Sequence, residues 1–198
     1  ISEHDLTTTY TKVYIQQLRE FGIADPDHRP QATEYVSEMI EIISRLIHQE
    51  AAYEIAGSGV YFSVNAFDGY GALVGRTAGD LRESAQARIA SDEEKEDPLD
   101  FALWKAAKPG EPTWESPWGP GRPGWHIECV AMSLDILGEG FDIHGGGTDL
   151  AFPHHENERA EAEASGHAFA RHWMHSAMLN VNGEKMAKSL GNFRTLGD

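Results

Sequence analysis

The sequence has a single cysteine, Cys129, and no long hydrophobic run. One thiol cannot form a disulfide within the chain, so we expect a reducing compartment and a thiol available for packing or for chemistry. No apolar stretch approaches the ~20 residues of a membrane-spanning helix, and residues 1–5 lack the cationic start of a signal peptide. We therefore expect a cytoplasmic protein without membrane contacts.

Basic residues are also scarce. The chain has 16 Lys and Arg against 32 Asp and Glu, for a formal net charge of -16, which opposes non-specific binding to phosphate backbones. The excess of acidic residues lies mainly in residues 1–100, so we expect a polyanion to bind near the C-terminus. With 198 residues, 40% of them hydrophobic, the chain is long and apolar enough for one large or two small globular domains.

The hydrophobic pattern divides the chain into zones, without internal repeats. Up to about residue 50, apolar residues recur at three- and four-residue steps, most clearly between Val36 and Ile47, which predicts a core helix that Thr33 can cap. Alternating apolar residues on both sides of 57–59 predict a β-hairpin. Residues 68–97 are rich in glycine and acid and show no clear pattern.

From Pro98 onward the sequence is dense in Trp, Gly, Pro and His. Residues 124–137 are typical of a helix, 140–143 of a short buried strand, and 144–149 of a glycine-rich loop. Pro153 would then begin another helix, because proline is tolerated in a first turn. A strand, a glycine loop and a helix form an α/β unit, and ligands bind at the carboxyl ends of parallel strands in such units.

Three side chains in this zone are candidate metal ligands. His154 and Glu158 are four residues apart on the predicted helix, so they share one face, and Cys129 supplies a thiolate. Thiolate, imidazole and carboxylate all bind zinc, and the sulfur favours Zn²⁺ over Mg²⁺ or Ca²⁺. The alternative is that Cys129 is a small buried hydrophobe and the histidines and acids form a solvated helix face.

Three further features are candidate binding residues. His144 precedes three glycines, which let a ligand approach the backbone closely, although the glycines alone would also suit a tight turn. Trp125 can form a pocket wall or simply pack. Lys185 and Lys188 lie on a segment between Gly183 and Gly191, where their ammonium groups can follow polyphosphate oxygens; alone, this segment would be an exposed basic loop.

Four long motifs in order give the chain a family resemblance. It resembles the cysteinyl-tRNA synthetases, a family of class I aminoacyl-tRNA synthetases, at GRPGWHIEC (121–129), FDIHGGGTD (141–149), FPHHENE (152–158) and KMAKSLGNF (185–193). The resemblance extends more weakly upstream through residues 97–105 and 114–118. It implies an α/β fold: residues 98–198 as the second half of a Rossmann-like nucleotide-binding domain with parallel strands, ending in the KMAKS loop. Residues 1–97 would be a mainly helical connective insertion with a β-hairpin.

The resemblance also implies an activity and a set of site residues. The expected reaction is the ATP- and Mg-dependent activation of L-cysteine to cysteinyl-adenylate and its transfer to tRNA(Cys), by a monomeric ligase in protein synthesis. Cys129, His154 and Glu158 match zinc ligands, and the zinc binds the substrate thiolate, which serine cannot match. Trp125 and His144 match residues that line the amino-acid pocket. Lys185 and Lys188 match the catalytic lysines that hold the ATP phosphates.

The sequence departs from the family pattern in two respects. Residue 187 is alanine where the family usually has serine. The His-x-Gly-His signature and the cysteine ahead of it, which supplies another zinc ligand, have no counterpart. The sequence therefore indicates an internal piece of a synthetase, without the N-terminal half or an anticodon-binding domain, inactive alone and with weakened zinc binding. Water, His144 or His155 would complete the zinc tetrahedron.

Two other interpretations stay open at this point. The related mycothiol-pathway ligase also activates cysteine but transfers it to an amino sugar, and it would share the zinc site and the lysine loop. A non-catalytic metal- or RNA-binding module would retain the scaffold without the first half of the domain.

Overall fold

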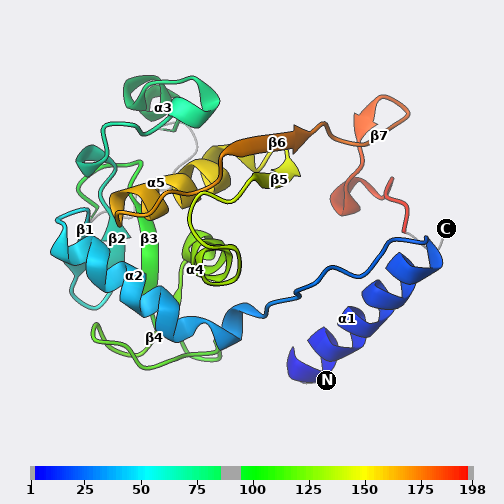
Figure 1. Ribbon diagram of the computed structural model, residues 1–198, viewed down its shortest axis with the longest axis horizontal. Coiled ribbons are helices and arrows are strands. Elements are labelled where there is room, and N and C mark those ends of the chain that lie inside the picture. The colour runs from blue at the N-terminus through cyan, green and yellow to red at the C-terminus, as the bar shows by residue number, and fades with distance from the viewer. Residues whose placement is uncertain (1–2, 86–94, 196–198) are drawn as a thin grey trace. The chain divides into compact units, whose positions relative to one another are not determined.

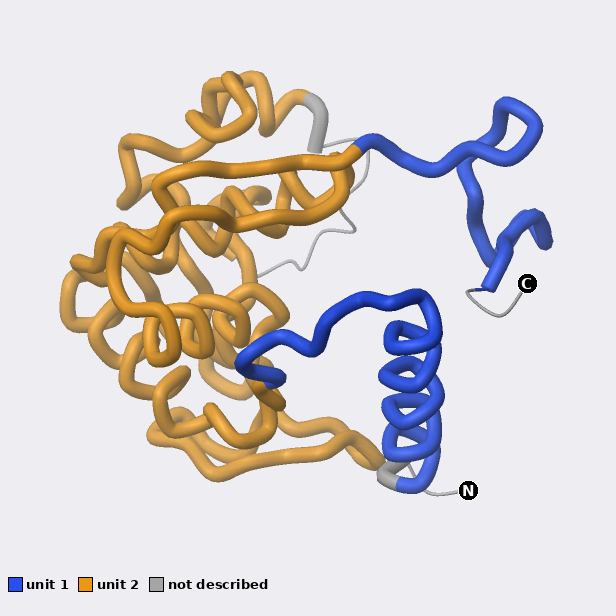
Figure 2. The backbone as a smooth tube through the Cα atoms, turned by 45° about the vertical axis from the view of Figure 1, so that its right-hand side comes forward, with its two compact units in different colours: residues 1–29, 177–198 blue, residues 30–176 orange. Residues whose placement is uncertain are grey.

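The computed structural model describes residues 3–85 and 95–195 and divides into two compact units. The larger unit comprises residues 30–176, and the smaller one combines residues 1–29 with 177–198 (Figure 2). The predicted boundary at residue 97 lies within the larger unit and stays a prediction.

Four antiparallel strands form the main sheet of the larger unit (Figure 1). In sheet order they are β1 (Ala52–Ile55), β2 (Gly59–Phe62), β3 (Phe101–Ala106) and β4 (Gly121–Pro123). β1 and β2 form the hairpin predicted around residues 57–59. The prediction of a parallel Rossmann-like sheet is not confirmed here, because β3 pairs with both neighbours in antiparallel fashion. No helix connects β3 to β4, and a parallel crossover usually needs one.

Three helices build the core with this sheet. α2 (Val36–His48) packs against β1 and α4 (Trp125–Leu137), and α4 also packs against β3 and α5 (Glu156–Ala164) (Figure 1). The predicted helices over 36–47 and 124–137 are thus confirmed. Their fully buried side chains meet those of the strands, and the shared core includes Met39, Ile43, Leu46, Phe62, Leu103, Trp104, Ile127, Val130 and Ala160.

The predicted cap of α2 is wrong. Thr33 lies in a short 3-10 helix, η1 (Ala32–Glu34), and α2 begins only after Tyr35, which makes no side-chain capping hydrogen bond. The helix is therefore stabilised by the burial of its apolar face and not by an N-terminal cap.

A second, two-stranded sheet is parallel. β5 (Ile143–Gly147) pairs with β6 (His172–Ser176), so His144 and its glycines belong to a strand and not to the predicted loop. The strand forms because β6 pairs with it over its whole length, and the glycines serve close packing, since a Cβ on Gly146 would lie 2.8 Å from Cε1 of His155. Glycine permits this approach between the strand and the following turn.

The helix predicted from Pro153 begins later. Ala151–His155 forms a π-helical turn, η4, in which Phe152 is extended (φ -142°, ψ 132°), and α5 starts at Glu156. A residue that precedes proline is disfavoured in the helical region, which accounts for the extended Phe152 and for the later start of the regular helix. His154 thus lies in the turn and Glu158 in the helix.

The segment without a clear sequence pattern contains short helices. It includes η3 (Ala72–Val74) and α3 (Ala78–Ala85), after η2 (Val64–Ala66). Residues 86–94 of that segment lie outside the described residues.

The smaller unit contains a helix and a short hairpin. α1 (Glu3–Glu20) lies in the N-terminal zone of three- and four-residue apolar steps, and its Val13 is exposed. β7 (Asn180–Val181) and β8 (Glu184–Lys185) pair around Asn182 and Gly183, both at positive φ, and η5 (Lys188–Leu190) follows. Among the described residues, no helix has the length and apolar character to cross a membrane.

Candidate functional site

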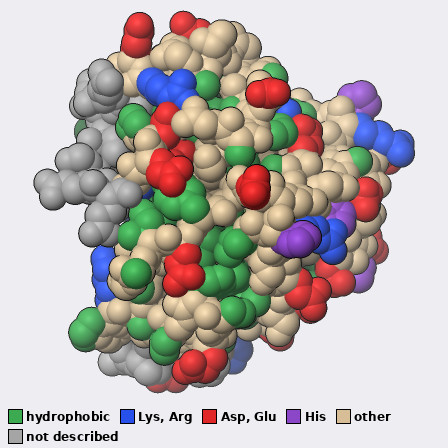
Figure 3. All heavy atoms as spheres, turned by 90° about the vertical axis from the view of Figure 1, so that its left-hand side faces the viewer, with side chains coloured by type: hydrophobic (Ala, Val, Ile, Leu, Met, Phe, Trp, Pro, Cys, Tyr) green, Lys and Arg blue, Asp and Glu red, His purple; other side chains and the backbone are tan. Residues whose placement is uncertain are grey.

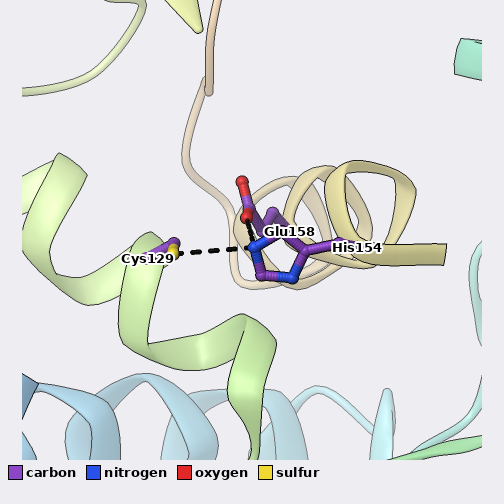
Figure 4. Close-up of side chains that lie close together, drawn as sticks. All are labelled: Cys129, His154 and Glu158. Atoms are coloured by element: carbon purple, nitrogen blue, oxygen red, sulfur yellow. Dashed lines mark hydrogen bonds and ion pairs between the residues drawn. The ribbon is translucent and has the colours of Figure 1, made fainter. Parts of the chain in front are cut away.

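The thiol, imidazole and carboxylate predicted as metal ligands lie together. Sγ of Cys129, on α4, is 3.7 Å from Nε2 of His154, and that nitrogen is 2.7 Å from Oε1 of Glu158, on α5 (Figure 4). All three ligand atoms lie within 4.8 Å of one another. Packing of α4 against η4 and α5 therefore brings Cys129 to a histidine 25 residues away in the sequence.

The burial of this trio fits a bound cation. Glu158 is fully buried and His154 is 5% exposed. Histidine nitrogens lie 2.6 and 2.7 Å from the two carboxylate oxygens of Glu158, yet neither oxygen has a hydrogen bond of acceptable geometry within the described residues. A buried charge without such bonds is costly unless a positive partner compensates it. Thiolate, imidazole and carboxylate are the donors that zinc accepts, so these residues fit a zinc ion.

The pKa values of Cys129 and Glu158 also bear on metal binding. Burial raises the pKa of the Cys129 thiol to about 12, and the nearby carboxylate of Glu158 adds to the effect. Burial also raises the pKa of Glu158, but the close imidazoles of His144 and His154 outweigh it and bring that pKa to about 2. Without a cation the thiol stays protonated, whereas a bound metal would stabilise the thiolate.

Two residues of the first turn of α4 cover the histidine of the trio. Trp125 stacks on His154, with ring centroids 4.1 Å apart and an interplanar angle of 22°, and Trp125 is 58% exposed. Nδ1 of His126 lies 2.7 Å from Nδ1 of His154. If His154 offers its Nε2 lone pair to a metal, its proton is on Nδ1, which then donates to His126. The sequence reasoning missed His126, although its position three residues before Cys129 places both on one helix face.

His144 borders the trio on the side of Glu158. Its Nε2 lies 2.6 Å from Oε2 of Glu158, and its ring centroid is 4.6 Å from that of His155. His155 in turn places Nδ1 2.8 Å from Nε2 of His175, on β6. The ligand atoms of His144, His155 and Glu158 also lie within 4.8 Å of one another. The predicted pocket residue is thus found beside the metal ligands. With it lie His155, which the sequence offered as a possible further zinc ligand, and His175, which the sequence did not indicate.

A buried polar network fixes α5 from the segment between β2 and β3. The backbone N–H of Leu73 donates to Oε2 of Glu156 at 2.9 Å, and the hydroxyl of Tyr70 donates to Oδ1 of Asn157 at 2.6 Å. Arg159 donates to Glu156 and to the carbonyl of Gly69. The residues on both sides of Glu158 are therefore held, which restricts the orientation of its carboxylate.

A cavity of about 750 Å³ adjoins Trp125 and His126. Its lining combines aromatic rings with three lysines, Lys95, Lys105 and Lys108. Acidic side chains are spread over the face shown in Figure 3, in keeping with the net charge, so three ammonium groups around one cavity are a local exception. This cavity suits an anionic ligand that carries rings.

The lysine segment lies in the smaller unit. Lys185 ends β8 and Lys188 begins η5, and both side chains are exposed. Asn192 fixes the segment, because its side chain accepts from the N–H of Ala187 at 2.9 Å and donates to the carbonyl of Lys185 at 3.1 Å. Gly191 has φ of 66°, so it serves a left-handed turn. The roles of both lysines stay predictions.

Comparisons with known proteins place the whole chain in one family. The family described as "tRNA synthetases class I (C) catalytic domain" matches residues 1–198. A cysteine–tRNA ligase of Carboxydothermus hydrogenoformans is 56% identical over 194 residues, which cover 98% of this chain and 41% of that protein. The cysteine–tRNA ligase of Solidesulfovibrio magneticus is 53% identical over 198 residues, which cover all of this chain and 40% of that protein. The one of Nitratidesulfovibrio vulgaris is 54% identical over 199 aligned residues, which cover all of this chain and 41% of that protein. The chain thus spans about 40% of the length of these relatives.

Proposed function

Because the chain belongs to the family of class I (C) tRNA synthetase catalytic domains, we propose that it is the part of a cysteine–tRNA ligase that selects the amino acid and holds ATP. The proposed reaction is the activation of L-cysteine by ATP, with Mg²⁺, and the transfer of the cysteinyl group to tRNA(Cys). We further propose a cytoplasmic monomer. The N-terminal part of the chain, residues 1–97, would be the connective insertion, and 98–198 the second half of the catalytic domain.

The observation that carries the proposal is the convergence of Cys129, His154 and Glu158. These three would hold a zinc ion, which when bound supplies a Lewis acid with high affinity for a thiolate. A serine hydroxyl binds zinc far more weakly, so such a site rejects an amino acid that a cavity of similar size could not exclude by shape. The buried network around Glu158 would keep the ligands in place when substrate enters.

Several other residues have proposed roles. Trp125 and His144 would line the cysteine pocket, since both contact the proposed ligands. Lys185 and Lys188 would donate to the ATP phosphates as charge develops on them, with Lys188 binding ATP. The lysines of the 750 Å³ cavity would give the single-stranded end of the tRNA a cationic surface in an otherwise acidic protein.

The amino acid specificity can be tested with the full-length protein. ATP–pyrophosphate exchange is expected with cysteine and at least ~100-fold less with serine. Cys129→Ser should lose cysteine-dependent exchange, whereas Ser133→Ala, a matched hydroxyl change on the same helix, should retain it. Exchange with serine equal to that with cysteine would contradict the proposal.

The acceptor requires a separate experiment. The relatives named above are all cysteine–tRNA ligases, which favours tRNA over an amino sugar. Cysteine transfer to tRNA and to glucosaminyl-inositol should therefore be compared, with transfer to tRNA expected. Transfer to the amino sugar alone would instead support the mycothiol-pathway ligase, and the absence of exchange and transfer would support a non-catalytic module.

A further inference from the structure

Glu158 directs its two carboxylate oxygens at different histidines. Oε1 lies 2.7 Å from Nε2 of His154, whereas Oε2 lies 2.6 Å from Nε2 of His144. Within the described residues, both oxygens and Nε2 of His144 are buried and lack a hydrogen bond of acceptable geometry. The second oxygen therefore faces an imidazole nitrogen in the same way as the first, which is the arrangement of two donors on either side of a cation.

His155 completes a second set of donors around that oxygen. Its ligand atom lies within 4.8 Å of those of His144 and Glu158, the same limit that the trio with Cys129 meets. His155 is 2% exposed, and its Nδ1 lies 2.8 Å from His175. A metal-binding histidine usually makes a hydrogen bond through its other nitrogen, so His155 has the partner expected of a ligand.

We propose that His144, His155 and Glu158 form a second site for a divalent transition-metal ion, which shares Glu158 with the site of Cys129 and His154. Two imidazoles and one carboxylate suit Zn²⁺ and Co²⁺, whereas Mg²⁺ and Ca²⁺ prefer oxygen donors throughout. Because each site uses its own oxygen of Glu158, both ions bind at once. Known two-metal sites hold their ions ~3.5–4 Å apart.

The second ion has a consequence for the first site. It engages His144, which we propose above as a residue of the cysteine pocket. The first equivalent of zinc is therefore expected to support cysteine binding, and the second to weaken it. This consequence rests on the proposed function, whereas the existence of the second site does not.

Cobalt titration of the metal-free protein tests the site directly, because only the first site contains sulfur. The wild type should bind two equivalents of Co²⁺ with micromolar affinity or tighter. The thiolate-to-cobalt charge-transfer band should be complete after one equivalent, and the visible d–d bands should grow until two. No ligase activity is needed, so a failure of the proposed function would leave this result interpretable.

Variants assign each equivalent to its donors. His155→Gln should bind one equivalent and keep the full charge-transfer band, which also shows that its fold is intact. Cys129→Ser should bind one equivalent without the band. His172→Gln, an exposed histidine change on β6, should still bind two. A wild type that binds one equivalent, or a His155→Gln variant that binds two, would overturn the proposal.

A milder variant keeps the test informative if His155→Gln does not fold. His175→Gln removes the partner of His155 but no proposed ligand. It should weaken the second equivalent by ~10–100-fold and leave the first unchanged. Unchanged affinity for the second equivalent in this variant would also contradict the site.

Discussion

Trp125 stacks on His154 with ring centroids 4.1 Å apart, although Trp125 itself is 58% exposed. An indole that is mostly exposed but stacks on a buried imidazole contributes little to the core. Trp125 also lines the 750 Å³ cavity, where a ligand could reach it. We therefore expect Trp125 to affect binding more than stability.

Replacement of Trp125 tests this expectation. Trp125→Ala should raise the KM for cysteine by about tenfold or more while lowering the free energy of unfolding by only ~1 kcal/mol, the contribution of one aromatic pair. Trp125→Phe retains a ring over His154 and should lie close to the wild type in both. Steady-state kinetics and urea unfolding measure the two effects. A large loss of stability with an unchanged KM would mean that Trp125 merely packs.

The affinity of the trio for metal should depend on pH. Burial raises the pKa of Cys129 to about 12, so at neutral pH the metal must displace a proton from the thiol. The apparent affinity should then rise by about tenfold per pH unit between pH 7 and 8.5, because one proton is released per ion. The cobalt charge-transfer band reports this site alone. An affinity that does not change over this range would mean that Cys129 is not a ligand.

Gly146 should be intolerant of a side chain. A Cβ there would lie 2.8 Å from Cε1 of His155 and 3.0 Å from Cδ1 of Leu150, so Gly146→Ala must displace the turn before α5. We expect a loss of ~1–3 kcal/mol in the free energy of unfolding. Gly145→Ala is the matched control, because its Cβ would meet only the carbonyl of Met174 at an ordinary 3.7 Å. Equal stability of the two variants in urea titrations would contradict the packing described here.

Glu161 should make the protein less stable as the pH rises. Burial raises its pKa well above the usual value, with the charge of Glu158 adding to the shift, and the residue is fully buried. Because the folded pKa exceeds the unfolded one, the stability linked to its protonation is complete below the unfolded pKa near ~4.3 and is lost as the pH rises through the folded value.

Glu161→Gln removes this titration. In metal-free protein, the variant should gain stability relative to the wild type from pH 5 to pH 8, as followed by urea unfolding at each pH. Glu54→Gln, an exposed change on β1, should show no such trend. A constant difference between Glu161→Gln and the wild type across this range would show that Glu161 does not titrate there.

The parts of the fold that follow from local pattern were predictable. The apolar periodicity of residues 36–47 and the alternation around residues 57–59 predicted α2 and the β1–β2 hairpin, because both depend on neighbours in the sequence. The pairing of strands that are distant in the sequence could not be predicted, because hydrophobic periodicity carries no information about which strands are partners. β3 pairs with β2 of the hairpin in antiparallel fashion. β5 extends through Gly147 because each of its residues pairs with a residue of β6 that is 29 positions later in the sequence.

The candidate site was predictable to the same extent. The four-residue spacing placed His154 and Glu158 on one face, and the only cysteine completed the trio, because chemistry limits which residue types bind zinc. His126 and His175 were missed, since their contacts arise from packing of α4, η4 and β6, whereas His155 was predicted only as one of several groups that could complete the zinc tetrahedron. No residue pattern in the sequence shows that Glu158 faces two histidines.

The central claim is that Cys129, His154 and Glu158 hold a zinc ion that distinguishes a thiol from an alcohol. X-ray absorption spectroscopy of the full-length protein loaded with one equivalent of zinc tests it most directly. We predict sulfur at ~2.3 Å with nitrogen or oxygen at ~2.0–2.2 Å, and one additional sulfur when cysteine is added but none with serine. A zinc environment without sulfur, or one that cysteine leaves unchanged, would contradict the claim.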